Sequence, residues 1–359
     1  MNTISRRELL LTIPALAAAP RIFAQDPKPP AVPVKALSSF ELSVSDMKRS
    51  IDFYQGLFGM PIQARWGDSV LMRIGPGPQF MLLSPAGTGM PRIVPRLGMT
   101  VENFNADRIG GMLEKHGFMK AAASDPGLTG GAMKYKVTNR GNTPEMFLGD
   151  PDNFILQIQD TTYAGGTGPM GSTVSVEASP KKGLVALKDM SHFTIGASNA
   201  TTTQDFYQNV FGAPVRSRQA TTPAMGIGPL PSVMFLMFLG GGGGGRGARG
   251  GAAPAAGAAA PAPAPAATRA NVNHVSMNME NFNRETVTKA MVEFGLTSSG
   301  EAASTGPLKT YVSLRMPNRG GAEGGTPELY FTDPDGLLLQ LQDVKYCGGG
   351  GYLGDVCLG

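Results

Sequence analysis

Histidine is the residue type in this chain best suited to bind a metal, and the sequence has only three: His116, His192 and His274. Neutral imidazole binds Fe, Mn, Zn or Ni, and two histidines with one oxygen ligand leave coordination positions open for a substrate. The alternative for each is a hydrogen-bonded histidine in the core. His116 precedes Gly117 at an expected helix end, where an imidazole can meet terminal carbonyls, so we expect a structural role there.

Other catalytic constellations find no support in the sequence. The two cysteines, Cys347 and Cys357, lie in a Gly-rich C-terminal tail with no histidine near them in sequence. The glycine run at 240–245 lacks the lysine and helix start of a phosphate-binding loop. In an oxidising compartment, Cys347 and Cys357 are expected to form a disulfide that closes a short loop.

The N-terminus predicts such a compartment. Residues 5–10 have the twin-arginine pattern SRRELL, and an apolar stretch follows at 9–19. Because a bilayer span takes about 20 apolar residues, a cleaved signal peptide over 1–24 is preferred to an uncleaved anchor. We expect export to the periplasm or extracellular space by a route that carries folded proteins, which suits a chain that binds its cofactor first. A Pro-rich linker follows at 25–36.

Composition and charge exclude several classes of function. Of the net charge of +4, the first 24 residues contribute +2, and no Lys/Arg stripe interleaved with aromatics remains to bind nucleic acid. No internal apolar run approaches the length of a membrane span. The chain has 359 residues, of which 42% are hydrophobic, so we expect two compact units. The expected partner is a small molecule, and the chain is expected to be a homodimer or a monomer by internal duplication.

An internal repeat is the most informative pattern in the chain. Three motifs occur in both halves: DFYQ at 52–55 and 205–208, ENFN at 102–105 and 280–283, and TPE followed by DPD at 143–152 and 326–335. The separation between copies grows from 153 to 183 residues along the chain. A Gly/Ala/Pro tract at 240–270 accounts for the extra length and has no side chains able to form a core.

Each half is predicted to hold two modules, each with a strand, a helix and three strands. In the first module Asp46 is a good helix N-cap and Gly59 ends the helix. The second module has an expected helix at 106–115 and expected final strands at 145–148 and 154–159. The sequence therefore predicts an α+β protein of four βαβββ modules.

These modules are expected to pair into two domains, at 37–160 and 184–344. A linker rich in Gly, Ser and Thr at 161–183 would join them. Residues 345–359 are left as a Gly-rich tail that carries the cysteine pair.

The repeated motifs resemble those of the vicinal oxygen chelate superfamily, which includes glyoxalase I, extradiol dioxygenases and bleomycin-resistance proteins. The resemblance rests on a helix with Phe-Tyr and then Phe-Gly, a module-opening strand that ends in Glu-Asn-Phe, and an Asp-Pro-Asp turn before the last strand. It covers nearly everything from 37 to 344. It implies that each pair of modules forms an open cup whose opposite walls hold one metal ion and leave room for two neighbouring substrate oxygens.

The resemblance also implies a metal site in the second half. In the family, a ligand on each first strand precedes the residue that caps the helix by seven positions, which gives His192 and His274 here. The third ligand follows the first Asp of the Asp-Pro-Asp turn by seven, which is Gln340 where the family has Glu. Alternatively Gln340 is a hydrogen-bonding residue, since Gln157 repeats it, and Glu328 supplies the missing carboxylate.

The first half has a different set at the matching positions. Ser39, Arg96 and Gln157 stand there, and Arg96 would repel a cation, so we expect a degenerate domain without a metal. An alternative role for Arg96 is to bind an anionic ligand. In the second half Tyr330 replaces Phe147 and resembles the tyrosine of extradiol enzymes that hydrogen-bonds a substrate oxygen; aromatic core packing is the alternative.

Two functional hypotheses follow. The first is an exported dioxygenase or glyoxalase-like lyase that uses one divalent metal in the second domain to act on a small substrate with vicinal oxygens. The second is a non-enzymatic protein that sequesters a small molecule, as bleomycin-resistance proteins do. The matched histidines favour the first hypothesis, and the loss of every Glu at a metal position favours the second.

Overall fold

The computed structural model describes residues 30–228, 234–239 and 271–357. The expected signal peptide at 1–24 and the Gly/Ala/Pro tract at 240–270 lie outside the described residues, as does the first part of the expected linker at 25–36. Among the described residues, no helix has the length and apolar character needed to cross a membrane.

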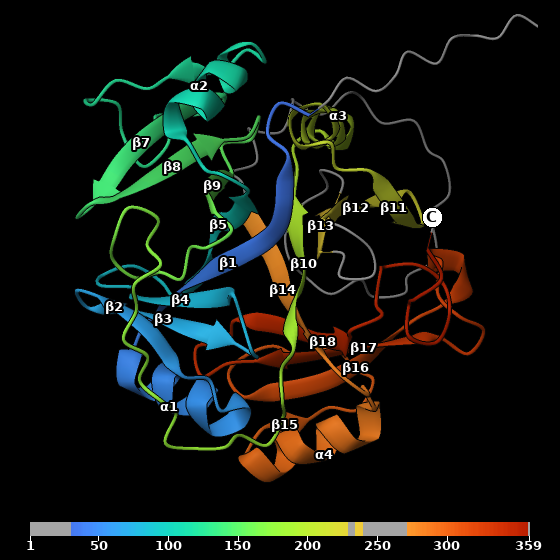
Figure 1. Cartoon of the computed structure of the whole chain (residues 1–359). Coiled ribbons are helices and arrows are strands. Elements are labelled where there is room, and N and C mark those ends of the chain that lie inside the picture. The colour runs from blue at the N-terminus through green and yellow to red at the C-terminus, as the bar shows by residue number, and fades with distance from the viewer. Residues whose placement is uncertain (1–29, 229–233, 240–270, 358–359) are drawn as a thin grey trace, which may run out of the picture.

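Each half of the chain forms a nine-stranded sheet of its own (Figure 1). The first half contains β1 (Val34–Val44), α1 (Met47–Phe58), β2 (Ile62–Trp66), β3 (Ser69–Ile74), β4 (Gln79–Pro85), β5 (Arg92–Val101), α2 (Ala106–Glu114), β6 (Met119–Lys120), β7 (Lys134–Arg140), β8 (Thr143–Gly149) and β9 (Ile155–Asp160). Its strand order is β2-β3-β4-β1-β5-β9-β8-β7-β6. The first strands of the two modules, β1 and β5, therefore pair at the centre of the sheet.

The second half repeats this topology. It contains β10 (Asp189–Gly196), α3 (Ala200–Phe211), β11 (Val215–Gln219), β12 (Thr222–Ile227), β13 (Met234–Leu239), β14 (Asn271–Met279), α4 (Arg284–Phe294), β15 (Thr297–Ser298), β16 (Lys309–Arg315), the 3₁₀ helix η2 (Pro317–Arg319), β17 (Thr326–Thr332) and β18 (Leu338–Asp343). Its strand order is β11-β12-β13-β10-β14-β18-β17-β16-β15. The predicted α+β architecture of four βαβββ modules in two domains is confirmed.

The helix that opens each half begins and ends on the residues that the sequence indicates. Asp46 and Asn199 accept a hydrogen bond from the backbone of the third residue after them, which satisfies a free N–H of the first turn. Gly59 and Gly212 follow the last turns with φ of 67° and 66°, a left-handed conformation that glycine adopts without steric cost. Helix α2 ends at Glu114, one residue earlier than expected.

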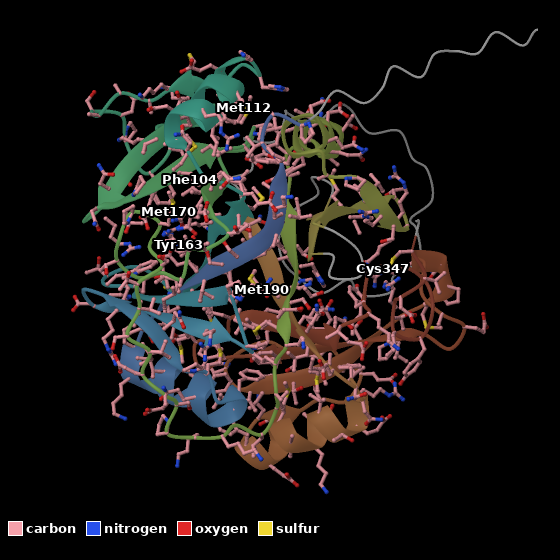
Figure 2. All side chains as sticks on the ribbon, in the orientation of Figure 1. Phe104, Met112, Tyr163, Met170, Met190 and Cys347 are labelled. Carbon is pink, nitrogen blue, oxygen red and sulfur yellow. A yellow bond between two sulfur atoms is a disulfide. The ribbon has the colours of Figure 1, made fainter. Side chains whose placement is uncertain are left out.

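The alternation of side chains along β1 and β10 divides each strand between two environments. Phe40 and Phe193 point away from the cups into a core that both halves share, where their rings meet edge to face with centroids 6.1 Å apart. Met190 belongs to this core and lies near the centre of the molecule in Figure 2. His192, next to Phe193 on β10, faces the other way. The register shift between Met190 and His192 lets Met190 join the core although only one residue separates the two. The shared core thus fixes which side chains each cup receives.

Helices pack across the two halves rather than within one. Figure 1 shows α1 beside α4 at the bottom of the molecule, where the rings of Phe53 and Phe294 lie 5.6 Å apart. The matching contact at the top of the view joins α3 to the segment that follows α2, through the rings of Phe206 and Phe118, 5.9 Å apart. Each half therefore packs its first helix on the second module of the other half, and the two contacts are related by an approximate two-fold symmetry.

The two Asp-Pro-Asp turns take part in the same exchange. Tyr54 on α1 donates a hydrogen bond to Asp333 Oδ2 at 3.1 Å, and Tyr207 on α3 donates to Asp150 Oδ2 at 3.4 Å. Each aspartate also accepts two backbone N–H groups of its own turn through Oδ1. Burial raises the pKa of Asp333 to about 6 and that of Asp150 to about 7, against the lowering effect of the backbone donors.

The segment expected to join the domains lies against the first sheet. Glu177 forms an isolated bridge with Ile62 and an ion pair with Arg65. Strand β1 also begins at Val34, within the segment expected to be a Pro-rich linker.

The raised pKa values predict a pH dependence of stability. A carboxyl whose pKa is higher in the folded protein than in the unfolded chain stabilises the fold below about pH 4 and loses that contribution as the pH rises through its folded value. We expect the free energy of unfolding to fall between about pH 4 and pH 7, and Asp333→Asn to flatten this slope in urea denaturation series. Asp335→Asn, which removes a carboxylate bound to Ser45 and Arg49, should keep most of the slope. An equal slope in wild type and Asp333→Asn would contradict the assignment.

Candidate metal site

A row of side chains crosses one face of the second sheet. In the strand register His192 on β10 lies opposite Ser276 on β14, Ser276 opposite Gln340 on β18, Gln340 opposite Tyr330 on β17, and Tyr330 opposite Tyr311 on β16. The register therefore brings three of the four residues predicted as metal ligands or catalytic groups into one line.

The fourth residue, His274, completes the group from β14. Its Nε2 lies 3.2 Å from Nε2 of His192 and 3.2 Å from the Thr194 hydroxyl. The opposite ring nitrogens are also held, with His192 Nδ1 3.1 Å from Ser191 Oγ and His274 Nδ1 2.8 Å from Asn273 Oδ1. Hydrogen bonds at Nδ1 fix each ring and direct both Nε2 atoms to one point.

Both imidazoles are neutral at neutral pH. Only 1% of His192 and 6% of His274 is exposed to solvent. Burial lowers the pKa of His274 to about 4, and burial together with the neighbouring His274 ring lowers the pKa of His192 well below its usual value. The Gln340 amide is near enough to oppose both shifts, although its Oε1 forms no hydrogen bond of normal geometry.

Gln340 Oε1 is a buried oxygen without a hydrogen-bond donor. The same position in the first sheet shows what this oxygen can face. There Gln157 Oε1 accepts hydrogen bonds from Nε and Nη2 of Arg96, with the Nε contact at 3.2 Å. In the first domain a cationic group therefore satisfies the amide, whereas in the second domain the arginine is replaced by His274.

The residues present fit a divalent metal. Two imidazole nitrogens bound at about 2.1 Å to one ion in tetrahedral or octahedral geometry lie about 3.0 to 3.4 Å apart, which matches the observed separation of the Nε2 atoms. Ser276 Oγ, in the same row, is a second buried oxygen without a partner. Within the described parts of the chain no three His, Cys, Asp or Glu side chains gather, so the side-chain oxygens beside the two imidazoles here are those of amides and hydroxyls.

Glu328 is already bound by other groups. It accepts hydrogen bonds from Arg315 Nε at 2.8 Å, from the Tyr346 hydroxyl at 3.2 Å and from the Tyr330 hydroxyl at 3.3 Å. The Arg315 side chain is fully buried. The carboxylate therefore neutralises a buried guanidinium and is not free to replace Gln340 as a ligand.

Tyr330 lies beside the histidines with its hydroxyl turned toward Glu328. Its ring meets His274 edge to face with centroids 5.2 Å apart and stacks on Tyr311 at 5.1 Å. Tyr330 therefore packs as an aromatic core residue and also lies beside the histidines. The hydrogen bond of its hydroxyl to a substrate oxygen, expected from the resemblance, stays a prediction.

Tyr346 was not predicted from the sequence to lie at this site. Its ring stacks on His192 with centroids 5.4 Å apart and an interplanar angle of 27°. A signal for it existed in the repeat, because Tyr163 and Tyr346 both follow the Gln-x-Gln-Asp ending by three residues. The two cysteines lie just beyond it, joined as a disulfide with their Cα atoms 6.2 Å apart. Figure 2 shows Cys347 and Tyr163 on opposite sides of the molecule, each beside the sheet of its own half.

The first cup is filled by its arginine. Arg96 forms an ion pair with Glu41 at 3.0 Å, and its guanidinium lies over the Phe147 ring at 5.0 Å. The space that remains, lined in part by Ser39 and Trp66, has a volume of about 10 Å³, which is about one water molecule. Because Glu41 already neutralises Arg96, the anionic ligand considered from the sequence gains no support from the charges here.

Comparisons with known proteins agree with this fold. The sequence profile of the Glyoxalase/Bleomycin resistance protein/Dioxygenase superfamily matches residues 36–122. Comparison with the curated proteins gave no match. The profile match confirms the resemblance to this superfamily over residues 36–122. The solved structures that follow are similar to most of the chain in fold.

Among these structures are extradiol dioxygenases. A catechol 2,3-dioxygenase has a TM-score of 0.53 and 13% identity over 89% of each chain. Homoprotocatechuate 2,3-dioxygenase from Brevibacterium fuscum, in complex with 3,4-dihydroxyphenylacetate, has a TM-score of 0.55 and 14% identity over 88% of this chain and 84% of that one. The enzyme of the same name from Arthrobacter globiformis gives 0.53 and 12% over 88% and 82%.

Because Arg315 is more deeply buried than Arg140, we predict that removing its counter-ion lowers the free energy of unfolding more than the matching change in the first domain. Glu328→Gln leaves this guanidinium without its counter-ion, which costs about 3–5 kcal/mol for a buried pair. Glu145→Gln removes the matching partner of Arg140, whose side chain is 24% exposed, so water compensates part of the loss. We expect the larger fall in unfolding free energy for Glu328→Gln in denaturant titrations. Equal losses in the two variants would show that burial of Arg315 does not set the cost.

Proposed function

We propose that the second domain binds one divalent metal through His192, His274 and Gln340, and that the protein is an exported metal-dependent enzyme of the dioxygenase or lyase type acting on a small substrate with vicinal oxygens. The observation that carries the proposal is the matched pair of amides. Gln157 Oε1 accepts hydrogen bonds from the guanidinium of Arg96, whereas Gln340 Oε1, beside two imidazoles, forms no hydrogen bond of normal geometry. The extradiol dioxygenase fold supports the same class of chemistry.

The chain's own groups have separate tasks in this function. The hydrogen bonds at Ser191 and Asn273 hold the two rings so that their Nε2 lone pairs converge. The bound metal would supply Lewis acidity and a template for two substrate oxygens. The rings of Tyr330 and Tyr346 wall the histidines and keep bulk water away from them.

The charge of the ligand set favours one kind of substrate. Two neutral imidazoles and an amide leave the charge of a divalent ion uncompensated, and Glu328 is occupied with Arg315. Anionic oxygens on neighbouring atoms, such as those of an ionised diol or a hydroxy acid, would supply the missing negative charge. Nitrogen donors with an amide oxygen suit Fe, Mn, Zn or Ni.

The proposed location is the periplasm or the extracellular space. The twin-arginine pattern at 5–10 is the basis for this proposal. The Cys347–Cys357 disulfide is consistent with it, because disulfides persist in oxidising compartments.

A sequestering protein is the second candidate. The observation in its favour is that no carboxylate among the described residues reaches the histidine pair, so a metal would be held by neutral ligands alone. In this case the second domain would bind an anionic small molecule without converting it.

Metal analysis of the mature chain separates the two candidates. We expect about one metal ion per chain, and its loss in both His192→Ala and His274→Ala, because each removes one of three ligands. His116→Ala is the control, since it removes the third histidine of the chain, which lies exposed at the end of α2. A wild-type chain that stays metal-free in the presence of Fe, Mn, Zn and Ni, and still binds a small molecule, would overturn the enzyme proposal.

Replacing the third ligand tests the role of Gln340 directly. Gln340→Glu keeps the side-chain length and adds the carboxylate that a divalent ion prefers, so metal affinity should rise about tenfold or more in competition with a chelator. Gln340→Leu should lower it. Gln157→Glu is the matched control in the first domain and should leave affinity unchanged. Equal affinity of all four proteins would remove Gln340 from the ligand set.

A further inference from the structure

The C-terminal segment covers the histidine pair. Residues 344–357, called here the C-terminal strap, place Tyr346 on the His192 ring. Hydrogen bonds from the sheet hold the strap: Arg315 Nη2 donates to Gly349 O at 2.9 Å, and the Thr326 hydroxyl donates to Gly351 O at 2.6 Å. The strap is therefore part of the wall of the site.

The first domain has the same strap without a cross-link. Residues 161–174 place Tyr163 over the first cup, and Arg140 Nη1 and the Thr143 hydroxyl donate to Gly166 O and Gly168 O at 2.9 and 2.6 Å. An isolated bridge closes each strap, between residues 167 and 173 in the first and between 350 and 356 in the second. In this register Ala164 and Val174 occupy the positions of Cys347 and Cys357.

The non-covalent anchors under the two straps differ. In the first domain Trp66 donates from Nε1 to Gly165 O at 2.7 Å, and Arg140 lies 4.5 Å over its ring. The matching residue in the second domain is Gln219, which donates one hydrogen bond to the Tyr346 hydroxyl at 2.9 Å. Ala224 likewise stands where the first strap packs on Leu71. The strap over the histidines has smaller anchors at these positions. It has in addition a hydrogen bond from the Ser217 hydroxyl to Cys347 O at 2.9 Å, which the matching Ala64 cannot make, and the disulfide.

We propose that the Cys347–Cys357 disulfide is a redox latch on the histidine site. With the bond formed, the strap keeps Tyr346 on His192. A dithiol reductant breaks the S–S bond by thiol–disulfide exchange, in which Cys347 and Cys357 gain two electrons and two protons and the dithiol becomes a disulfide. The strap then opens and a ligand reaches the imidazoles. The proposal deepens the proposed function, because such a latch would admit a metal under reducing conditions and retain it after oxidation.

Histidine modification tests the latch without any metal. The full mature chain, free of metal, is either left oxidised or reduced with dithiothreitol, which is then removed without oxygen because its thiols would consume the reagent. Both samples are treated with diethyl pyrocarbonate, and the rate at each histidine is followed by peptide mass spectrometry. His116 is exposed and serves as the internal standard, since the chain has only three histidines. We expect reduction to raise the rates at His192 and His274 by up to about a hundredfold. This is the factor by which the loop-closure entropy of a disulfide-closed loop of this length favours the closed state. The His116 rate should not change.

Two variants separate opening of the strap from unfolding of the domain. The double variant Cys347→Ser, Cys357→Ser should react at the fast rate with or without the dithiol. Tyr346→Ala, in which the disulfide remains, should expose His192 without reduction. Hydrogen exchange on β10 and β14 should stay slow in all samples. Histidines that remain protected after reduction would overturn the proposal, and so would loss of protection across the whole second sheet, which would make the disulfide a structural staple.

The outcome is independent of whether the site binds metal. If the metal assays fail and the modification rates rise as expected, the latch stands and only the metal function is lost. If metal binds and reduction leaves the modification rates unchanged, the metal function stands and the latch is lost. With metal bound, its release to a chelator should be slower for the oxidised chain than for the reduced chain.

Discussion

A buried oxygen that lacks a hydrogen-bond donor costs about 1–3 kcal/mol, and Gln340 Oε1 is such an atom at the centre of the second sheet. The fold offers it two neutral imidazoles whose Nε2 atoms already lie 3.2 Å apart. A cation between these three atoms, as proposed above, would satisfy all of them at once. The rest of the site is arranged around this requirement: the bonds at Nδ1 aim the rings, and the aromatic walls keep water out.

Because the chain is duplicated, the first cup can be compared directly with the second. The first cup has the same amide, but Arg96 brings the positive charge on a side chain and Glu41 neutralises it. In the first half a side chain of the protein thus satisfies the amide, whereas we propose that a bound metal does so in the second half. Both halves keep a tyrosine, an arginine and a glutamate that contact one another behind the cup: Tyr163, Arg140 and Glu145 in the first, and Tyr346, Arg315 and Glu328 in the second. Because the half without the histidines has the set too, we infer that these residues hold the straps and do not bind the metal.

The halves are held together by exchanged contacts. Because α1 packs on the fourth module and α3 on the second, the Asp-Pro-Asp turns act both as turns and as acceptors for tyrosines of the other half. Neither sheet can shift without disturbing the other, so the degenerate first domain supports the second through their common core. This gives the first half a physical role although its cup is filled.

The sequence by itself determined the modules and their order, because strand alternation and helix caps are local patterns that the repeat shows twice. The resemblance to a known family singled out His192, His274 and Gln340, although α4 is capped by Asn283 and not by Asn281, from which the position of His274 was counted. It also placed the cysteine pair in the tail. Only the tertiary structure decided that the tail folds back so that Tyr346 covers His192, that Glu328 is bound by Arg315, and that the supposed linker lies on the first sheet. These contacts join residues far apart in the chain, and no local pattern encodes which distant group meets a buried charge or an aromatic ring.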